Sequence, residues 1–146
     1  MASWKQFAAH APELAAFGDQ RLGGGKVAYF ATARADGSPR VHPVTPIIGD
    51  ELYLFMEPTS PKGKDLQHNP RYQLHCAVED SSGGAGEFYV RGRAKLVTDP
   101  AVRAEAIAAS SYPPADRYIL FVLSVDYAFM NVYTEAGANP RRWQAK

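Results

Sequence analysis

The chain has little of what several classes of protein depend on. It contains 1 cysteine, Cys76, in 146 residues, which excludes an intramolecular disulfide framework and any CxxC redox or zinc motif. Neither sign of charge is in excess, and the net charge of +1 provides no basic field for binding nucleic acid. No apolar run approaches the roughly 18 residues of a membrane-spanning helix. We therefore expect neither a nucleic acid nor a membrane as a partner.

Metal-binding motifs and targeting signals are also missing. The 4 histidines show no ligand spacing and no HExxH motif, so we expect no metal site. The N-terminus lacks the basic-then-apolar pattern of a secretion signal, and the expected location is the cytoplasm. What the chain does have is 46% apolar and 12% aromatic residues, which is typical of a globular protein. We expect a single domain over residues 1–146.

The N-terminal part, from about residue 3 to residue 22, has a helical pattern. Ser3 is a suitable N-cap, and the apolar residues that follow recur at the spacing of one helix face. Pro12 interrupts this pattern and is expected to begin a second helix. Gly18 and the three glycines at 23–25 are expected to end helical structure.

After Lys26 the sequence becomes rich in β-formers. Asp36-Gly37 is a strong hairpin-turn signal between the first two strands. Two further helices are expected, one opening at Ser60 and one at residues 101–110. The expected strands cover residues 27–34, 40–48, 52–56, 72–79, 88–97 and 118–133. This pattern predicts a mainly β protein with peripheral helices, built as a closed or nearly closed antiparallel barrel.

The strand that starts at Arg40 carries prolines at positions 39, 43 and 46. Proline cannot donate to a neighbouring strand and is therefore confined to sheet edges and bulges. This strand is expected to lie at an edge and to border a cleft.

The helix that opens at Ser60 has an unusual charge pattern. Ser60 suits the N-cap and Pro61 suits the first helical position. Lys62 and Lys64 then occupy the first turn, although the positive end of the helix dipole disfavours cations there. An anion such as phosphate, bound by the free amides and the two ammonium groups, would explain this pattern. A solvated lysine-rich loop would explain it equally well, and the residue types alone leave both open.

Three stretches together resemble a known family. They are, in chain order, ATARADGSPRVHPVTP, LYLFMEPTSPKGKDLQHNPR and EFYVRGRAKLV. From about Leu22 to Val97 this order of parts is similar to that of the FMN-binding split barrels related to pyridoxamine 5′-phosphate oxidase. The resemblance implies a six-stranded antiparallel split β-barrel. It also implies a homodimer with a flavin bound in a groove between the subunits.

The resemblance further implies which residues hold the cofactor. Arg40 matches the arginine that reaches the flavin phosphate. Ser60 and Lys62 match the serine and lysine of a phosphate-binding S-x-K motif, with Lys64 a candidate third contact. The positions that match the lining of the flavin ring and ribityl chain are Val41, His42, Pro43, Val44, Phe55 and Met56. A partly exposed structural histidine is an equally open interpretation of His42.

Several positions depart from the pattern of the true oxidase. Pro61 occupies the place of an arginine, and Glu87 the place of a glutamine that contacts flavin. The Tyr-x3-Arg-x3-Ser and Arg-x-His motifs for pyridoxal phosphate are missing. We therefore expect an FMN-dependent oxidoreductase with a small-molecule substrate that is not a pyridoxamine phosphate oxidase. An F420H2-dependent reductase and a non-catalytic flavin- or heme-binding protein are the alternatives.

A basic stripe formed by Tyr89, Arg91, Arg93 and Lys95 and the C-terminal Trp143 remain to be placed. In a homodimer with composite sites, the stripe or Trp143 is expected to approach the cofactor from the opposite chain. The alternatives are a solvated face or dimer surface for the stripe and a loosely packed tail for Trp143.

Overall fold

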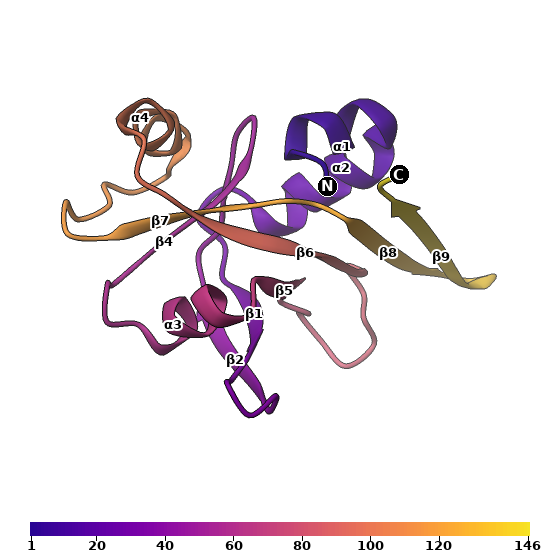
Figure 1. The fold of residues 1–146 in the computed structure, drawn as a ribbon. Coiled ribbons are helices and arrows are strands. Elements are labelled where there is room, and N and C mark those ends of the chain that lie inside the picture. The colour runs from indigo at the N-terminus through magenta and orange to yellow at the C-terminus, as the bar shows by residue number, and fades with distance from the viewer.

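The structure, a computed structural model, describes residues 1–146 as a long curled antiparallel sheet with helices on its surface (Figure 1). The strands are β1 (Ala28–Ala33), β2 (Pro39–Val44), β3 (Ile47–Ile48), β4 (Leu52–Met56), β5 (Arg71–Cys76), β6 (Glu87–Val97), β7 (Ile119–Leu123), β8 (Tyr127–Thr134) and β9 (Gly137–Gln144). The helices are α1 (Trp4–His10), α2 (Pro12–Leu22), α3 (Pro61–His68) and α4 (Pro100–Ala109). No helix is long and apolar enough to span a membrane.

The strands follow the order β2-β1-β5-β6-β7-β4-β3, and β6 is the long strand at its centre. The first part of β6 pairs with β8 and its last part with β7, while β9 extends the sheet beyond β8. The two ends of the order, β2 and β3, follow each other in the chain but are not paired. The sheet is therefore a barrel that stays open between these two strands, which confirms the predicted split-barrel class.

The strand count is nine, where the sequence predicted six. The segment 40–48 is divided into β2 and β3 around Pro46, which cannot donate a ladder hydrogen bond. The segment 118–133 is divided into β7 and β8, because residues 124–126 form a bend where the chain crosses from one part of β6 to the other. The C-terminal residues, for which a loosely packed tail was one of two open interpretations, make strand β9.

Alternating burial along the strands places the main core inside the curl. On β6, Phe88 and Val90 are fully buried, whereas Arg91 and Arg93, which follow them on the opposite face, are exposed. Strand β4 differs because all five of its residues are buried. Leu52, Leu54 and Met56 belong to the main core, while Tyr53 and Phe55 belong to a small cluster that α4 covers through Ala106.

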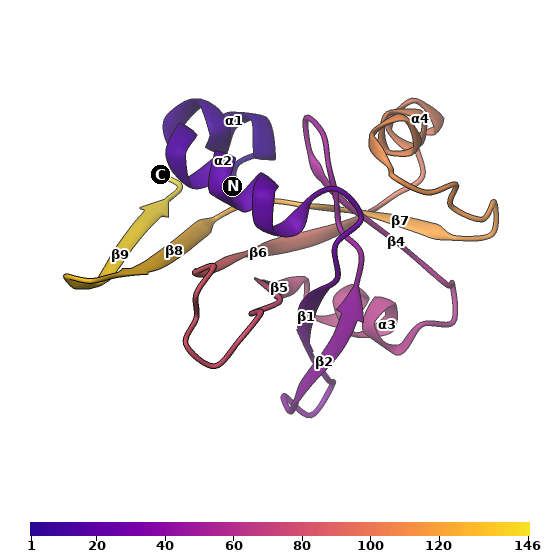
Figure 2. The same cartoon turned by 180° about the vertical axis from the view of Figure 1, so that it is seen from behind.

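The helices lie on two sides of the sheet. In both views α1, α2 and α4 lie on one side and α3 lies on the other (Figures 1 and 2). The predicted cap of α1 is confirmed, since the Ser3 side chain and Gln6 form a reciprocal capping box. The prediction that Gly18 ends a helix is wrong. Gly18 lies inside α2, where a Cβ atom would come within 2.5 Å of the Phe88 ring, so the glycine permits close packing on β6.

The β1–β2 hairpin and its edge position agree with the sequence analysis. Gly37 has a φ of +86° in the turn, and Asp36 accepts hydrogen bonds from the Ser38 amide and hydroxyl. Strand β2 pairs only with β1 and leaves its other edge free beside the opening of the barrel. The proline-rich strand thus lies at an edge, as predicted.

Candidate functional site

A cavity of about 380 Å³ lies where β2, β4 and α3 approach one another. Cavities that hold small molecules fall in the range of about 300–1,000 Å³. Most of its lining residues are apolar or aromatic, and one cationic side chain and one acidic side chain also reach it. The lining residues are Pro43, Val44, Thr45, Leu54, Phe55, Met56, Glu57, Lys62, Tyr112 and Tyr118.

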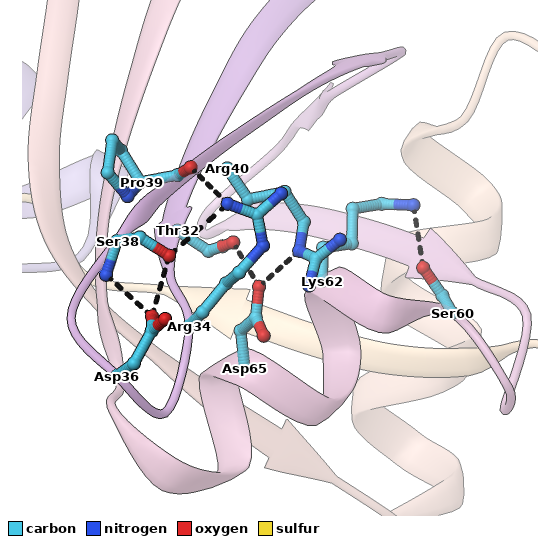
Figure 3. Close-up of polar contacts among 9 residues, drawn as sticks. All are labelled: Thr32, Arg34, Asp36, Ser38, Pro39, Arg40, Ser60, Lys62 and Asp65. Atoms are coloured by element: carbon cyan, nitrogen blue, oxygen red, sulfur yellow. Dashed lines mark hydrogen bonds and ion pairs between the residues drawn. The ribbon is translucent and has the colours of Figure 1, made fainter.

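The packing of α3 on β4 brings its first turn to this cavity. A Cβ atom on Gly63 would come within 2.9 Å of Met56 Sδ, so the glycine allows the helix to pack close to the strand. Ser60 is the N-cap residue, as predicted, but its hydroxyl does not cap the helix. Instead it accepts a hydrogen bond of 2.9 Å from Lys62 Nζ (Figure 3). The Lys64 amide donates to the Ser60 carbonyl, whereas the amides of Lys62 and Gly63 have no partner within the helix and are available to an anion.

Lys62 is half-buried, which lowers the pKa of its ammonium group below the ordinary value. Burial disfavours the charged form of a lysine, and a neighbouring anion favours it. An anion bound beside Lys62 would therefore be stabilised by a cation that has already lost part of its hydration. Lys64 is exposed and lies outside the cavity lining.

Arg40 does not line the cavity itself. Its Nε atom donates a hydrogen bond of 2.7 Å to Asp65 Oδ2, and Thr32 Oγ1 donates one of 2.8 Å to the same oxygen (Figure 3). Burial would raise the pKa of the Asp65 carboxyl group. The hydrogen bonds from Arg40 and Thr32 and the charge of Arg40 outweigh burial and hold this pKa below its ordinary value. Asp65 was not predicted as a site residue, although an acidic residue beside Leu66 on the buried face of a short helix is an available signal.

His42 lies close enough to Arg40 and Lys62 for both charges to act on it. Burial lowers the pKa of His42, and the positive charges of Lys62 and Arg40 lower it further. Its imidazole is therefore neutral at pH 7 and can both donate and accept a hydrogen bond. Val41, by contrast, is 61% exposed on the other face of β2. Any role that it has at the site is confined to its backbone.

An unpredicted wall of the cavity comes from the segment between α4 and β7. Tyr112 and Tyr118 line the cavity from this segment, which contains two prolines and no regular structure. Arg103 holds it in place by donating hydrogen bonds to the carbonyls of Tyr118 at 2.7 Å and Ala115 at 3.2 Å. The Arg103 guanidinium also lies 5.1 Å from the centre of the Phe55 ring. Aromatic residues in a proline-rich loop were the only signal for this wall in the sequence.

The structure therefore brings Pro43, Val44, Phe55, Met56 and Lys62 together around one cavity. Ser60 contacts this group through Lys62, and Arg40 and His42 lie beside it. The resulting site combines cationic groups and free helix amides with an apolar, aromatic hollow. Such a combination can hold a molecule that has both an anionic group and a planar ring.

Other residues singled out from the sequence lie elsewhere. Trp143 packs on α1, with its ring centre 5.0 Å from that of Phe7, and so belongs to a strand rather than to a loose tail. Cys76 is 1% exposed, and its Sγ atom accepts a hydrogen bond from the Phe88 amide. Glu87 lies at the start of β6 with a carboxylate oxygen 4.0 Å from His75 Nε2, and it is not part of the cavity lining.

The curled sheet with a cavity at its open edge defines the class of split β-barrels. Residues 18–130 match the model of the family described as pyridoxamine 5′-phosphate oxidase. The chain belongs to this family. No curated protein matches the sequence.

Solved structures with the same fold include proteins of different kinds. One is a heme binding protein from Mycobacterium smegmatis, with a TM-score of 0.66 and 19% identity over 86% of this chain. This chain spans only 57% of the length of that protein. General Stress Protein 26 from Bacillus anthracis str. Sterne has a TM-score of 0.66 and 16% identity, covering 89% of this chain and 97% of its own. An F420 reductase has a TM-score of 0.58 and 22% identity, and the match covers 75% of this chain and 94% of the reductase. These likenesses define the fold and leave the cofactor open.

Proposed function

We propose that this protein binds FMN and acts as a flavin-dependent oxidoreductase on a small-molecule substrate. The observation that carries the proposal is the meeting of Lys62 and the first turn of α3 with a cavity of mostly apolar and aromatic residues, with Arg40 held beside α3 by Asp65. A phosphate suits the cationic end, and a planar ring suits the walls formed by Val44, Phe55 and the two tyrosines. When bound, the flavin would supply the hydride chemistry, while the chain would bind, orient and shield it.

Each group of the site has a role in this proposal. Lys62, the amides of the first α3 turn and Arg40 would hold the phosphate through charge-assisted hydrogen bonds. Residues 41–44 would run beside the ring with the free edge of β2, and Phe55 and Met56 would contact the ring or ribityl chain. His42, neutral at pH 7, would offer a hydrogen bond to the flavin or the substrate.

The absorption spectrum of the purified protein tests the proposal directly. We expect the two visible bands of an oxidised flavin, or their appearance when apoprotein is titrated with FMN. A colourless protein that binds F420 and not FMN would favour the F420H2-dependent reductase. A Soret band would favour a heme-binding role, and binding of FMN without turnover by any nicotinamide or substrate would favour a carrier.

We further propose that the protein is a cytoplasmic homodimer. The outer face of the sheet carries aromatic rings that a monomer leaves in contact with water. Tyr89 stacks with His75 at 6.0 Å, with Tyr127 at 6.0 Å and with Phe129 at 5.1 Å between ring centres. Tyr29, opposite His75 on β1, is 46% exposed. A face of this kind marks a protein contact, and a second copy of the chain is the partner that the proposal names.

A further inference from the structure

A buried carboxylate lies next to the arginine of the proposed phosphate site. Asp65 is 7% exposed, and its Oδ2 atom accepts both the Arg40 Nε hydrogen bond at 2.7 Å and the Thr32 hydroxyl hydrogen bond at 2.8 Å. A carboxylate taken out of water loses hydration, which only well-formed partners offset. An acidic group in this place also weakens the attraction between the site and an anion, because it cancels one of the positive charges.

The geometry at Arg40 shows what the carboxylate does. Its contact with Asp65 engages Nε alone, and neither Nη atom donates a hydrogen bond within the chain. A guanidinium is planar and rigid, so fixing Nε fixes the direction of the Nη edge. With Nε engaged, the edge left for a phosphate is the one with the two outer nitrogens, which can donate two parallel hydrogen bonds. In Figure 3 the guanidinium of Arg40 lies on the side of Asp65 that faces Lys62.

We infer that Asp65 is a positioning residue for the anion site, and that Thr32 in turn fixes Asp65. The carboxylate holds the plane of the Arg40 guanidinium so that its free Nη edge is presented to the cofactor phosphate. This inference rests on the proposed function, because the phosphate is that of FMN. Its gain is in orientation, since an arginine that is already held in place loses less conformational freedom when the phosphate binds.

The sign of one affinity change separates this role from a simple charge effect. Asp65→Asn keeps the size of the side chain and removes its charge. If Asp65 only opposed the anion, the variant would bind FMN more tightly. If Asp65 positions Arg40, the variant binds FMN more weakly, by about tenfold, as is typical when a partner that orients a ligand-holding residue is lost. Asp50→Asn, at an exposed carboxylate without a side-chain hydrogen bond, is the matched control.

The experiment titrates FMN and riboflavin into apoprotein and follows flavin fluorescence. Riboflavin lacks the phosphate, so the ratio of the riboflavin dissociation constant to the FMN dissociation constant isolates the phosphate contribution. We expect Asp65→Asn to reduce this ratio about tenfold while riboflavin affinity changes less than about twofold. In an Arg40→Ala background, Asp65→Asn should no longer weaken FMN binding, because the arginine that it positions is gone.

Several outcomes would overturn the inference. They are an unchanged or raised FMN affinity in Asp65→Asn, an equal loss for riboflavin, and a loss that persists in the Arg40→Ala background. A wild-type protein that does not prefer FMN to riboflavin would instead contradict the proposed function itself. Should Asp65→Asn fail to fold, Thr32→Val removes one of the two donors to the carboxylate and is expected to shift the same ratio in the same direction by a smaller factor.

Discussion

Lys62 is the residue at which the two halves of the candidate site meet. Its side chain lines the apolar cavity, while its ammonium group reaches the hydroxyl of Ser60 at the start of α3. The position of Lys62 in the first helical turn is unfavourable for the helix alone, since the dipole places positive charge there. A bound phosphate would turn this local conflict into a favourable contact, because ammonium, amides and dipole would all face the same anion.

Removing the Lys62 ammonium is expected to weaken cofactor binding strongly. Lys62→Ala loses a charge-assisted hydrogen bond to a partly desolvated phosphate, which should cost about 1.5–3 kcal/mol of FMN binding. Lys5→Ala removes the same charge from an exposed position on α1 and should leave binding unchanged. Fluorescence titration with FMN measures both, and equal affinity of Lys62→Ala and wild type would contradict the assignment.

The ion pair of Asp65 and Arg40 makes a prediction about stability and pH. Because the folded state holds the pKa of Asp65 below its ordinary value, the stabilisation is present above about pH 4 and is lost as the pH falls through the folded-state pKa. Asp65→Asn should therefore be less stable than wild type at pH 7, and the gap should narrow on acidification. Urea denaturation at several pH values measures this, and a gap that stays constant or widens toward low pH would refute it.

At the scale of elements, one glycine controls how the two parts of the sheet join. A Cβ atom on Gly92 would lie 2.0 Å from the backbone oxygen of Ser124, where the chain crosses between β7 and β8. Backbone cannot move aside as a flexible side chain can. Tyr72 also donates its hydroxyl hydrogen bond to this oxygen at 2.7 Å, which ties β5 to the same crossing.

We expect Gly92→Ala to destabilise the fold by about 1–3 kcal/mol, the usual cost of forcing an extra group into a packed site. The midpoint of urea denaturation, monitored by circular dichroism, measures this change in stability. Lys95→Ala, at an exposed position on the same strand, should change stability by less than about 0.5 kcal/mol. A Gly92→Ala protein as stable as the Lys95→Ala control would show that the crossing is more flexible than the close approach implies.

Local signals explain which elements the sequence predicted well. Strand β4 and the Asp36-Gly37 turn were predicted where they occur, because β-formers and turn residues act over short distances. Strand β9 was missed, since its exposed and polar residues depend on pairing with β8 and carry no periodic pattern. Among the site residues, Lys62 followed from its helix position. Tyr118 and Asp65 did not, because their places depend on the Arg103 hydrogen bonds and on the Arg40 ion pair, which join different elements of the fold.

At the scale of the whole molecule, family membership does not imply the activity in the family's name. By its resemblance to the family, Pro61 occupies the place where the true oxidase has an arginine, and the C-terminal residues, which lack the Arg-x-His motif, form β9 against β8 and α1. We expect turnover of pyridoxamine 5′-phosphate to be weak or absent, because contacts for the second phosphate and its ring are missing. Oxidation assays with FMN-loaded protein test this, and turnover comparable to that of a dedicated oxidase would contradict it.

The exposed outer face of the sheet is expected to hold two copies of the chain together. A single barrel open between β2 and β3 has the free edge of β2 at that opening, and on the proposed function it would cover only part of a bound flavin. A second copy packed on Tyr29, Tyr89 and Phe129 would bury these rings and bring part of its own surface to the site of its partner. Arg91 and Arg93 of the basic stripe lie on this same exposed face and would then lie at or near the contact between the two copies.

We expect light scattering to give twice the 16.0 kDa of one chain at micromolar concentration. Tyr29→Glu places a charge on the outer face and should produce monomers that bind FMN weakly. Ile107→Glu is the matched control, because Ile107 on α4 is 44% exposed and Tyr29 is 46% exposed, so both variants add one charge at a half-exposed apolar side chain. The control should stay dimeric. A wild-type monomer that retains its cofactor would rule out the composite site, since one chain would then suffice to hold the flavin.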